Sequence, residues 1–204
     1  MGTDLADAFN RYGSDKDVNG YTPLYSALLS HLREDPITLV EVGIGTMIPD
    51  APSSMQGYAL PGYRPGGSLR AWRDWLPEAR IIGLDVQPDT QFVEDRIETR
   101  LCDSTDAESV ASTFERLGLV EADVIIDDGS HLDVDQIRTM RNLLPRLKKN
   151  GLYVIEDVYP GSLLTAKPET LREAGCAYPY FFSGLKSNLC VVQKVELNTR
   201  RRGY

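Results

Sequence analysis

The feature that most constrains the fold of this chain is a repeated order of segments. Short apolar or β-branched runs recur along the sequence, each followed by an acid or a glycine and then by an amphipathic stretch. The runs are residues 37–43, 80–85, 97–103, 122–128 and 152–157. Near-continuous apolar runs of this length are typical of strands that are buried on both faces of a parallel sheet.

Helical patterns lie between these runs. Residues 68–76 begin with an N-cap candidate, Ser68, and stop before a proline. Residues 106–117 and 134–147 carry apolar side chains at helical spacing, and the second stretch is followed by a lysine, asparagine and glycine stop at 148–151. The alternation of strands and helices predicts an α/β fold with a doubly wound, mostly parallel sheet.

The two ends of the chain complete the predicted domain. Runs at 178–183 and 188–195 predict a C-terminal antiparallel hairpin, which brings the sheet to seven strands. Helices within residues 1–35, over 4–10 and 22–33, are expected to pack on the sheet. A length of 204 residues suits a single domain over 1–204. Residues 47–67, rich in proline and glycine and without periodicity, are expected to form a mobile lid.

Charge and composition exclude several classes of protein. The net charge of −8 argues against a nucleic-acid binder, whose footprint is a basic face. No apolar run reaches the roughly 18 residues that span a bilayer, and the N-terminus does not resemble a signal peptide. Three scattered cysteines make no disulfide framework. We therefore expect a cytoplasmic protein without membrane contact and consider a homo-oligomer.

Acids and glycines at the first three strand tips predict a nucleoside site. Glu41 lies near the end of the first strand, and Gly43 and Gly45 follow it. The two glycines allow a ligand to approach the backbone closely. Asp85 ends the second strand, where an acid hydrogen-bonds ribose hydroxyls, and Asp103 ends the third, near the adenine. The third glycine of the dinucleotide motif and a P-loop are both absent, so the glycine pair is weak evidence by itself.

The last two strand tips carry carboxylates that suggest a metal site. Asp128 ends the fourth strand, and Glu156 and Asp157 end the fifth. Carboxylates that meet at one sheet edge repel one another unless a cation neutralises them, and oxygen ligands favour Mg²⁺, Mn²⁺ or Ca²⁺. Adjacent strand residues point to opposite faces, so Glu156 and Asp157 converge only where the strand ends or bends.

One of two histidines stands beside this predicted metal site. His131 lies three residues beyond Asp128, in the loop after the fourth strand. The imidazole titrates near neutral pH, which suits His131 to general base catalysis there.

Seven motifs taken together resemble a known family. They are YGSDK, YTPLY, EVGIGT, GGSLRAW, GLD, DDGSH and VIED. The set resembles the metal-dependent sugar O-methyltransferases of bacterial natural-product and antibiotic biosynthesis, which act on macrolide sugars of the mycinamicin type and are cousins of the cephalosporin hydroxylase-like proteins. The resemblance runs from Tyr12 to about Tyr159, and DDGSH paired with VIED is its most specific part.

The resemblance implies a class I, Rossmann-like methyltransferase that uses S-adenosyl-L-methionine and Mg²⁺ or another hard divalent cation. It implies Asp128, Glu156 and Asp157 as metal ligands, with His131 as the catalytic base beside Asp128. The cofactor residues that it implies are Glu41, Gly43, Gly45, Asp85 and Asp103, with Ser68, Tyr21 and Thr22 as weaker candidates. The acceptor would be a saccharide or glycoside, although residues 47–64 depart from the family pattern and leave its identity open.

Other functions fit parts of the sequence. A catechol or another aromatic diol could replace the sugar, because aromatic side chains suit either acceptor. A nicotinamide-dependent reductase would use a Tyr-x-x-x-Lys pair, and Tyr12 and Lys16 match that spacing, but they precede the glycine loop. A catalytically silent binding module is disfavoured by the intact set of acids and histidine.

Overall fold

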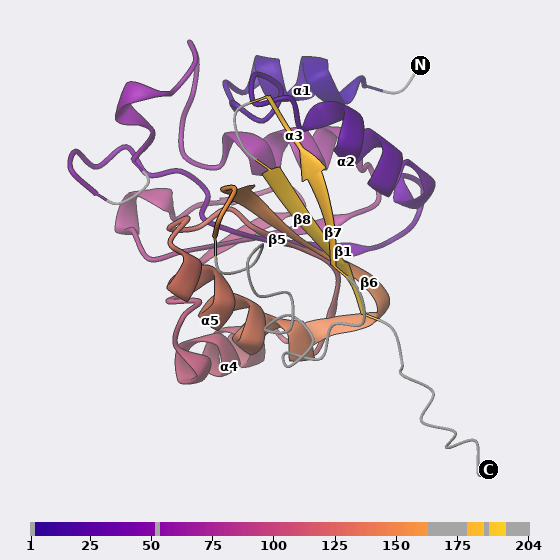
Figure 1. Ribbon diagram of the computed structural model, residues 1–204, viewed down its shortest axis with the longest axis vertical. Coiled ribbons are helices and arrows are strands. Elements are labelled where there is room, and N and C mark those ends of the chain that lie inside the picture. The colour runs from indigo at the N-terminus through magenta and orange to yellow at the C-terminus, as the bar shows by residue number, and fades with distance from the viewer. Residues whose placement is uncertain (1–2, 52–53, 163–178, 186–187, 195–204) are drawn as a thin grey trace.

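The protein is an α/β sandwich in which helices cover both faces of one sheet (Figure 1). The computed structural model describes residues 3–51, 54–162, 179–185 and 188–194. Its α-helices are α1 Leu5–Arg11, α2 Thr22–Leu29, α3 Gly67–Trp75, α4 Ala107–Arg116 and α5 Asp133–Leu143. Its strands are β1 Thr38–Val42, β2 Arg80–Asp85, β3 Val93–Glu94, β4 Ile97–Leu101, β5 Ala122–Asp127, β6 Leu147–Val158, β7 Pro179–Ser183 and β8 Asn188–Gln193.

The sheet has the strand order β3-β4-β2-β1-β5-β6-β8-β7. The five inner strands from β4 to β6 are parallel, and β3, β7 and β8 are antiparallel to their neighbours. The predicted class and the C-terminal hairpin are therefore confirmed. The predicted number of seven strands is wrong for the described residues, which form eight. The additional strand, β3, has only two residues, too few for periodicity to reveal.

Side chains alternate between two apolar cores, one on each face of the sheet. Leu39 of β1 packs in the core beneath α1, α2 and α3, and its neighbour Val40 packs in the core beneath α4 and α5. In Figure 1 these two groups of helices lie on opposite sides of the strands. In the first core the rings of Phe9 and Tyr25 each meet Trp72 edge-on at 4.9 Å, a geometry that aromatic pairs prefer. These contacts fix α1 and α2 to α3, and all three helices share this core with β1 and β2.

The boundary between α5 and β6 differs from the prediction. The helix expected over 134–147 ends at Leu143, and Pro145 lies in the 3-10 turn Leu144–Arg146 that follows. Proline cannot donate the next helical hydrogen bond. Residues 148–151, expected to be a helix stop, lie in the long strand β6. Among the described residues, no helix is long and apolar enough to cross a bilayer.

Close approach of two strand ends requires a glycine after β1. Gly43 has φ +76°, and a Cβ there would lie 2.0 Å from the backbone oxygen of Asp128. The backbone N–H of Asp128 in turn donates to the carbonyl of Val42 at 2.9 Å. The hydrogen bond and the close contact at Gly43 therefore hold the ends of β1 and β5 together, at the point where the strand order of the sheet reverses.

We predict that Gly43→Ala destabilises the fold by roughly 2–5 kcal/mol, because left-handed strain of about 1–2 kcal/mol adds to overpacking of about 1–3 kcal/mol. Gly118→Ala is the matched control, since Gly118 has φ +59° but open space around it. In urea unfolding, Gly118→Ala should lose only the roughly 1–2 kcal/mol of stability that comes from left-handed backbone strain. Equal losses in the two variants would refute the role of close packing at Gly43.

Candidate active site at the carboxyl edge of the sheet

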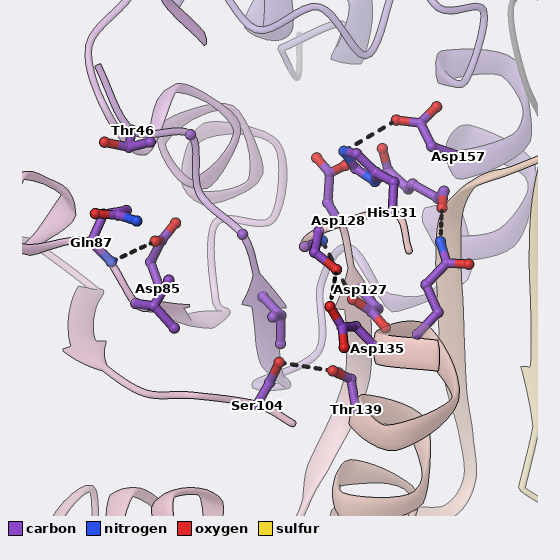
Figure 2. Close-up of a pocket in the computed structure, with 18 of the residues that line it drawn as sticks. Thr46, Asp85, Gln87, Ser104, Asp127, Asp128, His131, Asp135, Thr139 and Asp157 are labelled. Carbon is purple, nitrogen blue, oxygen red and sulfur yellow. Dashed lines mark hydrogen bonds and ion pairs between the residues drawn. The ribbon is translucent and has the colours of Figure 1, made fainter. Parts of the chain in front are cut away.

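A cavity of about 340 Å³ opens at the carboxyl ends of the parallel strands (Figure 2). It lies where the chain order reverses, because β2 and β4 extend the sheet to one side of β1, and β5 and β6 extend it to the other. Open α/β sheets bind ligands at such a switch point. The volume is within the range of small-molecule sites.

One wall of the cavity is the glycine loop with Asp85. Gly43 and Gly45 line the cavity, as predicted from the sequence. The Asp85 carboxylate also lines it, and it accepts hydrogen bonds from the backbone N–H groups of Ile44 and Gln87, both at 2.9 Å. Burial raises the pKa of Asp85 above its ordinary value, against the effect of these hydrogen bonds. Asp85 therefore shapes the loop and faces the cavity at once.

The floor of the cavity combines predicted and unpredicted residues. Asp103 lines it and accepts from the backbone and hydroxyl of Thr105 at 2.9 and 2.7 Å. Ser104, in the loop after β4, and Thr139 of α5 share a hydrogen bond of 2.8 Å, shown in Figure 2. The sequence analysis singled out neither hydroxyl, because a lone serine or threonine on a helix or loop carries no pattern of its own.

Three side chains on the far side of the cavity form a cluster that can hold a metal ion. Asp128, His131 and Asp157 each offer one ligand atom, and these atoms lie within 4.8 Å of one another. Nε2 of His131 is 3.7 Å from a carboxylate oxygen of Asp157, a contact drawn as a dashed line in Figure 2. Nδ1 of His131 is buried without a hydrogen-bond partner in the described structure. Carboxylate oxygens and an orphaned imidazole nitrogen are a donor set that suits a divalent cation.

Unusual backbone conformations bring this cluster together. His131 and Asp157 have φ angles of 58° and 53°, in the left-handed region that residues other than glycine rarely adopt. The pairing of β6 with β8 shifts register between Ile155 and Val158. Such an irregularity bends the strand and redirects a side chain, so Asp157 reaches the cavity although Glu156 precedes it. Strand β6 therefore has a bend at the place where the sequence analysis required one for Glu156 and Asp157 to converge.

Glu156 lines the cavity but bonds to the N-terminal part of the chain. Its Oε1 accepts from the Lys16 ammonium at 2.7 Å and from the hydroxyl of Tyr25. The same ammonium lies 2.7 Å from Asp128 and 3.3 Å from Glu41. Lys16 is only 1% exposed, so one buried cation joins the tips of β1, β5 and β6.

Strand periodicity explains the position of Glu41. It shares a face with Leu39, beneath α3, and its carboxylate accepts from Ser68 and from the indole of Trp72, both at 2.7 Å. Glu41 is fully buried and, like Ser68, does not line the cavity. The structure thus places both in a buried network behind the glycine loop, and their contact with a cofactor stays a prediction.

The tyrosines of the YTPLY motif support the acids of β6. The hydroxyl of Tyr21 donates to Asp157 at 2.7 Å, and Tyr25, one helical turn later, donates to Glu156. Tyr21 and Thr22 do not line the cavity, so their predicted cofactor contacts also stay predictions. Tyr25 and Lys16 were missed as site residues, although the motifs YTPLY and YGSDK contain them.

The electrostatics of the site call for a further cation. Burial raises the pKa of Asp128 to about 6, although the Lys16 ammonium lowers it. Burial and the charge of Asp128 raise the pKa of Glu156 well above its ordinary value. Burial also disfavours the Lys16 ammonium, but Asp128, Glu156 and Glu41 together hold its pKa well above its ordinary value. One ammonium facing three carboxylates, with Asp157 beside them, leaves negative charge for a divalent cation to neutralise.

The geometry also excludes the reductase pair. Tyr12 donates its hydroxyl proton to Asp74 at 2.7 Å, away from the cavity, whereas Lys16 bonds to carboxylates. The two side chains do not act on one ligand.

Comparison with known proteins identifies relatives but no family model that matches. A Streptomyces olivaceus enzyme, the 3'-O-methyltransferase of 8-demethyl-8-(2-methoxy-α-L-rhamnosyl)-tetracenomycin C, is 36% identical over 84% of this chain and 43% of its own. Mycinamicin VI 2''-O-methyltransferase of Micromonospora griseorubida is 33% identical over 98% of this chain and 48% of its own.

A solved structure agrees with these relatives. The methyltransferase MycE of the mycinamycin biosynthetic pathway, in complex with Mg, SAH and mycinamycin VI, matches with a TM-score of 0.73 and 27% identity. The match covers 96% of this chain and 55% of MycE. The chain therefore spans about half the length of the relatives that it matches. The class I methyltransferase fold and the resemblance that the motifs predicted are confirmed.

We predict that Lys16→Met lowers the free energy of unfolding by about 3–5 kcal/mol, because it leaves buried carboxylates without their cation. Added Mg²⁺ should restore part of the loss, and Glu41→Gln in the same chain should restore another part. Lys148→Met is the control: Lys148 bonds to Asp123 at 2.8 Å but is 44% exposed, so it should cost at most about 1 kcal/mol. Chemical unfolding gives the free energy of unfolding of the wild type, Lys16→Met, the double variant Lys16→Met/Glu41→Gln and Lys148→Met. Equal losses for the two lysines would contradict the central role of Lys16.

Proposed function

This chain is a homologue of sugar O-methyltransferases, and from that premise we propose that it transfers a methyl group from S-adenosylmethionine to a sugar hydroxyl of a glycosylated natural product. The observation that carries the proposal is the cluster of Asp128, His131 and Asp157 at the edge of a cavity lined by the glycine loop. It puts two carboxylates that could hold a metal ion, and an imidazole that could act as the base, next to a site of cofactor size. Antibiotic biosynthesis and a cytoplasmic location are parts of the same proposal.

The cofactor would occupy the side of the cavity formed by β1, β2 and β4. Gly43 and Gly45 leave room for its backbone contacts, and Asp85 and Asp103 face it from the next two strand tips. An acid after the second strand is placed to accept hydrogen bonds from ribose hydroxyls. The sulfonium group supplies a methyl carbon with a good leaving group, so the chain mainly has to position the two reactants.

The lid expected within residues 47–67 would close this side. Met55 lines the cavity, and its backbone N–H donates to Thr46 at 2.9 Å. The hydroxyl of Tyr63 donates to the carbonyl of Gly45 at 2.7 Å. These contacts support the lid expected within residues 47–67, which would exclude water from the methyl transfer.

On the opposite side, His131 would act as the base. A divalent cation held by Asp128 and Asp157, with Glu156 as a third ligand, would supply Lewis acidity that eases the loss of a proton from a hydroxyl group. Asp157 orients His131 through their contact of 3.7 Å. His131 accepts the proton as the sugar oxygen bonds to the methyl carbon and the carbon–sulfur bond breaks. The products are a methyl ether and S-adenosylhomocysteine.

We predict that Asp85→Ala weakens binding of S-adenosylhomocysteine by about 1–3 kcal/mol, because ribose hydrogen bonds are lost. Asp89→Ala is the matched control. Asp89 also holds the loop, through Thr46 and the backbone of Met47 at 2.6 and 2.8 Å, but it does not line the cavity. Calorimetry should show a much smaller loss for the control. An unchanged affinity in Asp85→Ala would remove Asp85 from the cofactor site.

We predict that His131→Gln cuts turnover by about 10²–10⁴-fold while S-adenosylhomocysteine still binds, because only the proton acceptor is lost. Asp128→Asn should instead weaken Mg²⁺ binding and recover part of its activity in excess Mg²⁺. Steady-state kinetics and calorimetry measure these effects, with His31→Gln as an exposed control remote from the cavity. Full turnover by EDTA-treated protein would eliminate the metal, and wild-type turnover by His131→Gln would require another base.

A further inference from the structure

The N-terminal loop, residues 12–20 between α1 and α2, also reaches the cofactor cavity. Asp15 and Asn19 of this loop line the cavity, although neither has a part in the proposed function. Lys16, which lies between them in sequence, bonds to Asp128 at 2.7 Å, directly after β5. The loop therefore brings to the cavity two polar side chains that the strand tips do not supply.

Asn19 has a hydrogen-bond acceptor that nothing in the described structure uses. Its Nδ2 donates to a carboxylate oxygen of Asp15 at 3.1 Å. An ionised carboxylate only accepts, so this bond fixes which end of the amide is the oxygen. That oxygen, Oδ1, is buried without a partner, and Asn19 is only 8% exposed. Because a buried acceptor without a donor is costly, we expect a ligand in the cavity to supply the donor.

The backbone keeps Asn19 in this position. Its N–H donates to the carbonyl of Asp15 at 2.8 Å, and its own carbonyl accepts from the N–H of Leu185 at 2.9 Å. Rotation of the side chain toward another partner would break the bond between Nδ2 and Asp15. Oδ1 is therefore held ready for a donor that arrives through the cavity.

Tyr63 connects this loop to the glycine loop. A Cβ at Gly13 would lie 2.9 Å from the Cα of Tyr63, and a Cβ at Gly45 would lie 1.9 Å from its hydroxyl oxygen. Tyr63 thus packs against both loops. Burial raises the pKa of Tyr63, and nearby carboxylates that include Asp15 raise it further, which agrees with this arrangement. Asp15 and the glycine loop are therefore close neighbours at the cavity.

The order of the strand tips gives each part of the cofactor a place. Strands β4, β2, β1 and β5 are successive neighbours in the sheet. In the proposed function, Asp103 after β4 faces the adenine, and Asp85 at the end of β2 faces the ribose. The amino-acid part of the cofactor then lies over β1 and toward β5. Asp15 and Asn19 line the cavity from the loop that covers this end.

We propose that Asp15 and Asn19 bind the α-ammonium group of the cofactor's amino-acid part; the inference rests on the proposed function. An ammonium group has three N–H donors and a positive charge. It can donate to the carboxylate of Asp15 and to Oδ1 of Asn19 at once, and the bond to a carboxylate is charge-assisted. Among the described residues that line the cavity, none is a lysine or an arginine that would repel it.

The alternative donor is a hydroxyl group of the acceptor sugar. A hydroxyl could satisfy Oδ1 of Asn19, but it brings no charge to the carboxylate of Asp15. The reacting hydroxyl also has to lie within hydrogen-bond reach of His131. The ammonium group fits both side chains of the pair, whereas the hydroxyl fits one.

Calorimetry with three adenosyl compounds tests the pair. The full chain with Mg²⁺ is titrated with S-adenosylhomocysteine, with its analogue that lacks only the α-amino group, and with 5′-methylthioadenosine, which lacks the whole amino-acid part. We expect S-adenosylhomocysteine to bind about 10- to 100-fold tighter than the analogue without the amino group, because hydrogen bonds to charged groups are lost. This ratio is the amine preference.

Variants connect the amine preference to the N-terminal loop. Asp15→Asn keeps an oxygen that can accept from Asn19 but loses the charge, and Asn19→Leu keeps the size of the side chain but loses Oδ1. Each should reduce the amine preference at least threefold and change the affinities for the other two compounds less than twofold. Asp17→Asn is the matched control, because Asp17 lies in the same loop and accepts from Asn10 at 3.0 Å but does not line the cavity.

Thermal unfolding shows which variants are folded in the calorimeter. Asp15→Asn decides the question alone if Asn19→Leu is unfolded, since Asp15 is only partly buried. An amine preference that falls in Asp15→Asn and stays at the wild-type value in Asp17→Asn supports the pair.

Four results would overturn the assignment. They are equal binding of S-adenosylhomocysteine and its analogue, an amine preference that survives the loop variants, the same reduction in Asp17→Asn, and equal losses for all three compounds. The last would mean that the loop only supports the fold of the site. A surviving preference together with weaker binding of methyl α-L-rhamnoside would assign the pair to the sugar instead. Failure of all three adenosyl compounds to bind the wild type refutes the proposed function, and the inference with it.

Discussion

The buried ammonium of Lys16 is the interaction on which the rest of the site depends. It lies within 3.3 Å of carboxylates from β1, from the tip of β5 and from β6, three strands that are neighbours in the sheet. Buried carboxylates are costly unless paired and hydrogen-bonded. The loop that carries Lys16 therefore allows a parallel sheet to end in a set of acids. Tyr21, at the N-cap of α2, and Tyr25 within α2 complete this support by donating to Asp157 and Glu156.

Two residues of the candidate site have a strained backbone. His131 and Asp157 both adopt left-handed backbone conformations, each of which costs on the order of 1–3 kcal/mol. Regular strand geometry would send Asp157 into the core beneath α5, on the same face as Ile155. The irregular pairing of β6 with β8 instead turns its carboxylate toward His131. The sheet thus gives up ideal geometry where a side chain of β6 meets one from the loop that follows β5.

Strand positions could be predicted from the sequence because apolar runs and their terminal acids are local patterns. The tips of β2 and β5 were located to within a residue, and Asp85 and Asp128 line the cavity as expected. Lys16 could not be located in this way, since its partner Glu156 lies 140 residues further on and no periodicity links them. Glu41 is a different case. Its alternation with Val40 and Val42 already places it on the opposite face from theirs, toward Leu39 and α3.

The dependence on Lys16 makes the N-terminal segment part of the architecture of the candidate site. Its helices pack on α3 through Phe9 and Tyr25 against Trp72, and Trp72 also donates its indole N–H to Glu41 of β1. Apolar packing and the carboxylate network are therefore built from the same side chains. A change in how α1 and α2 sit on the sheet would move the Lys16 ammonium and the Tyr25 hydroxyl together, and with them the acids of β6. Packing of the N-terminal helices is thus the means by which the chain sets the position of its proposed metal ligands.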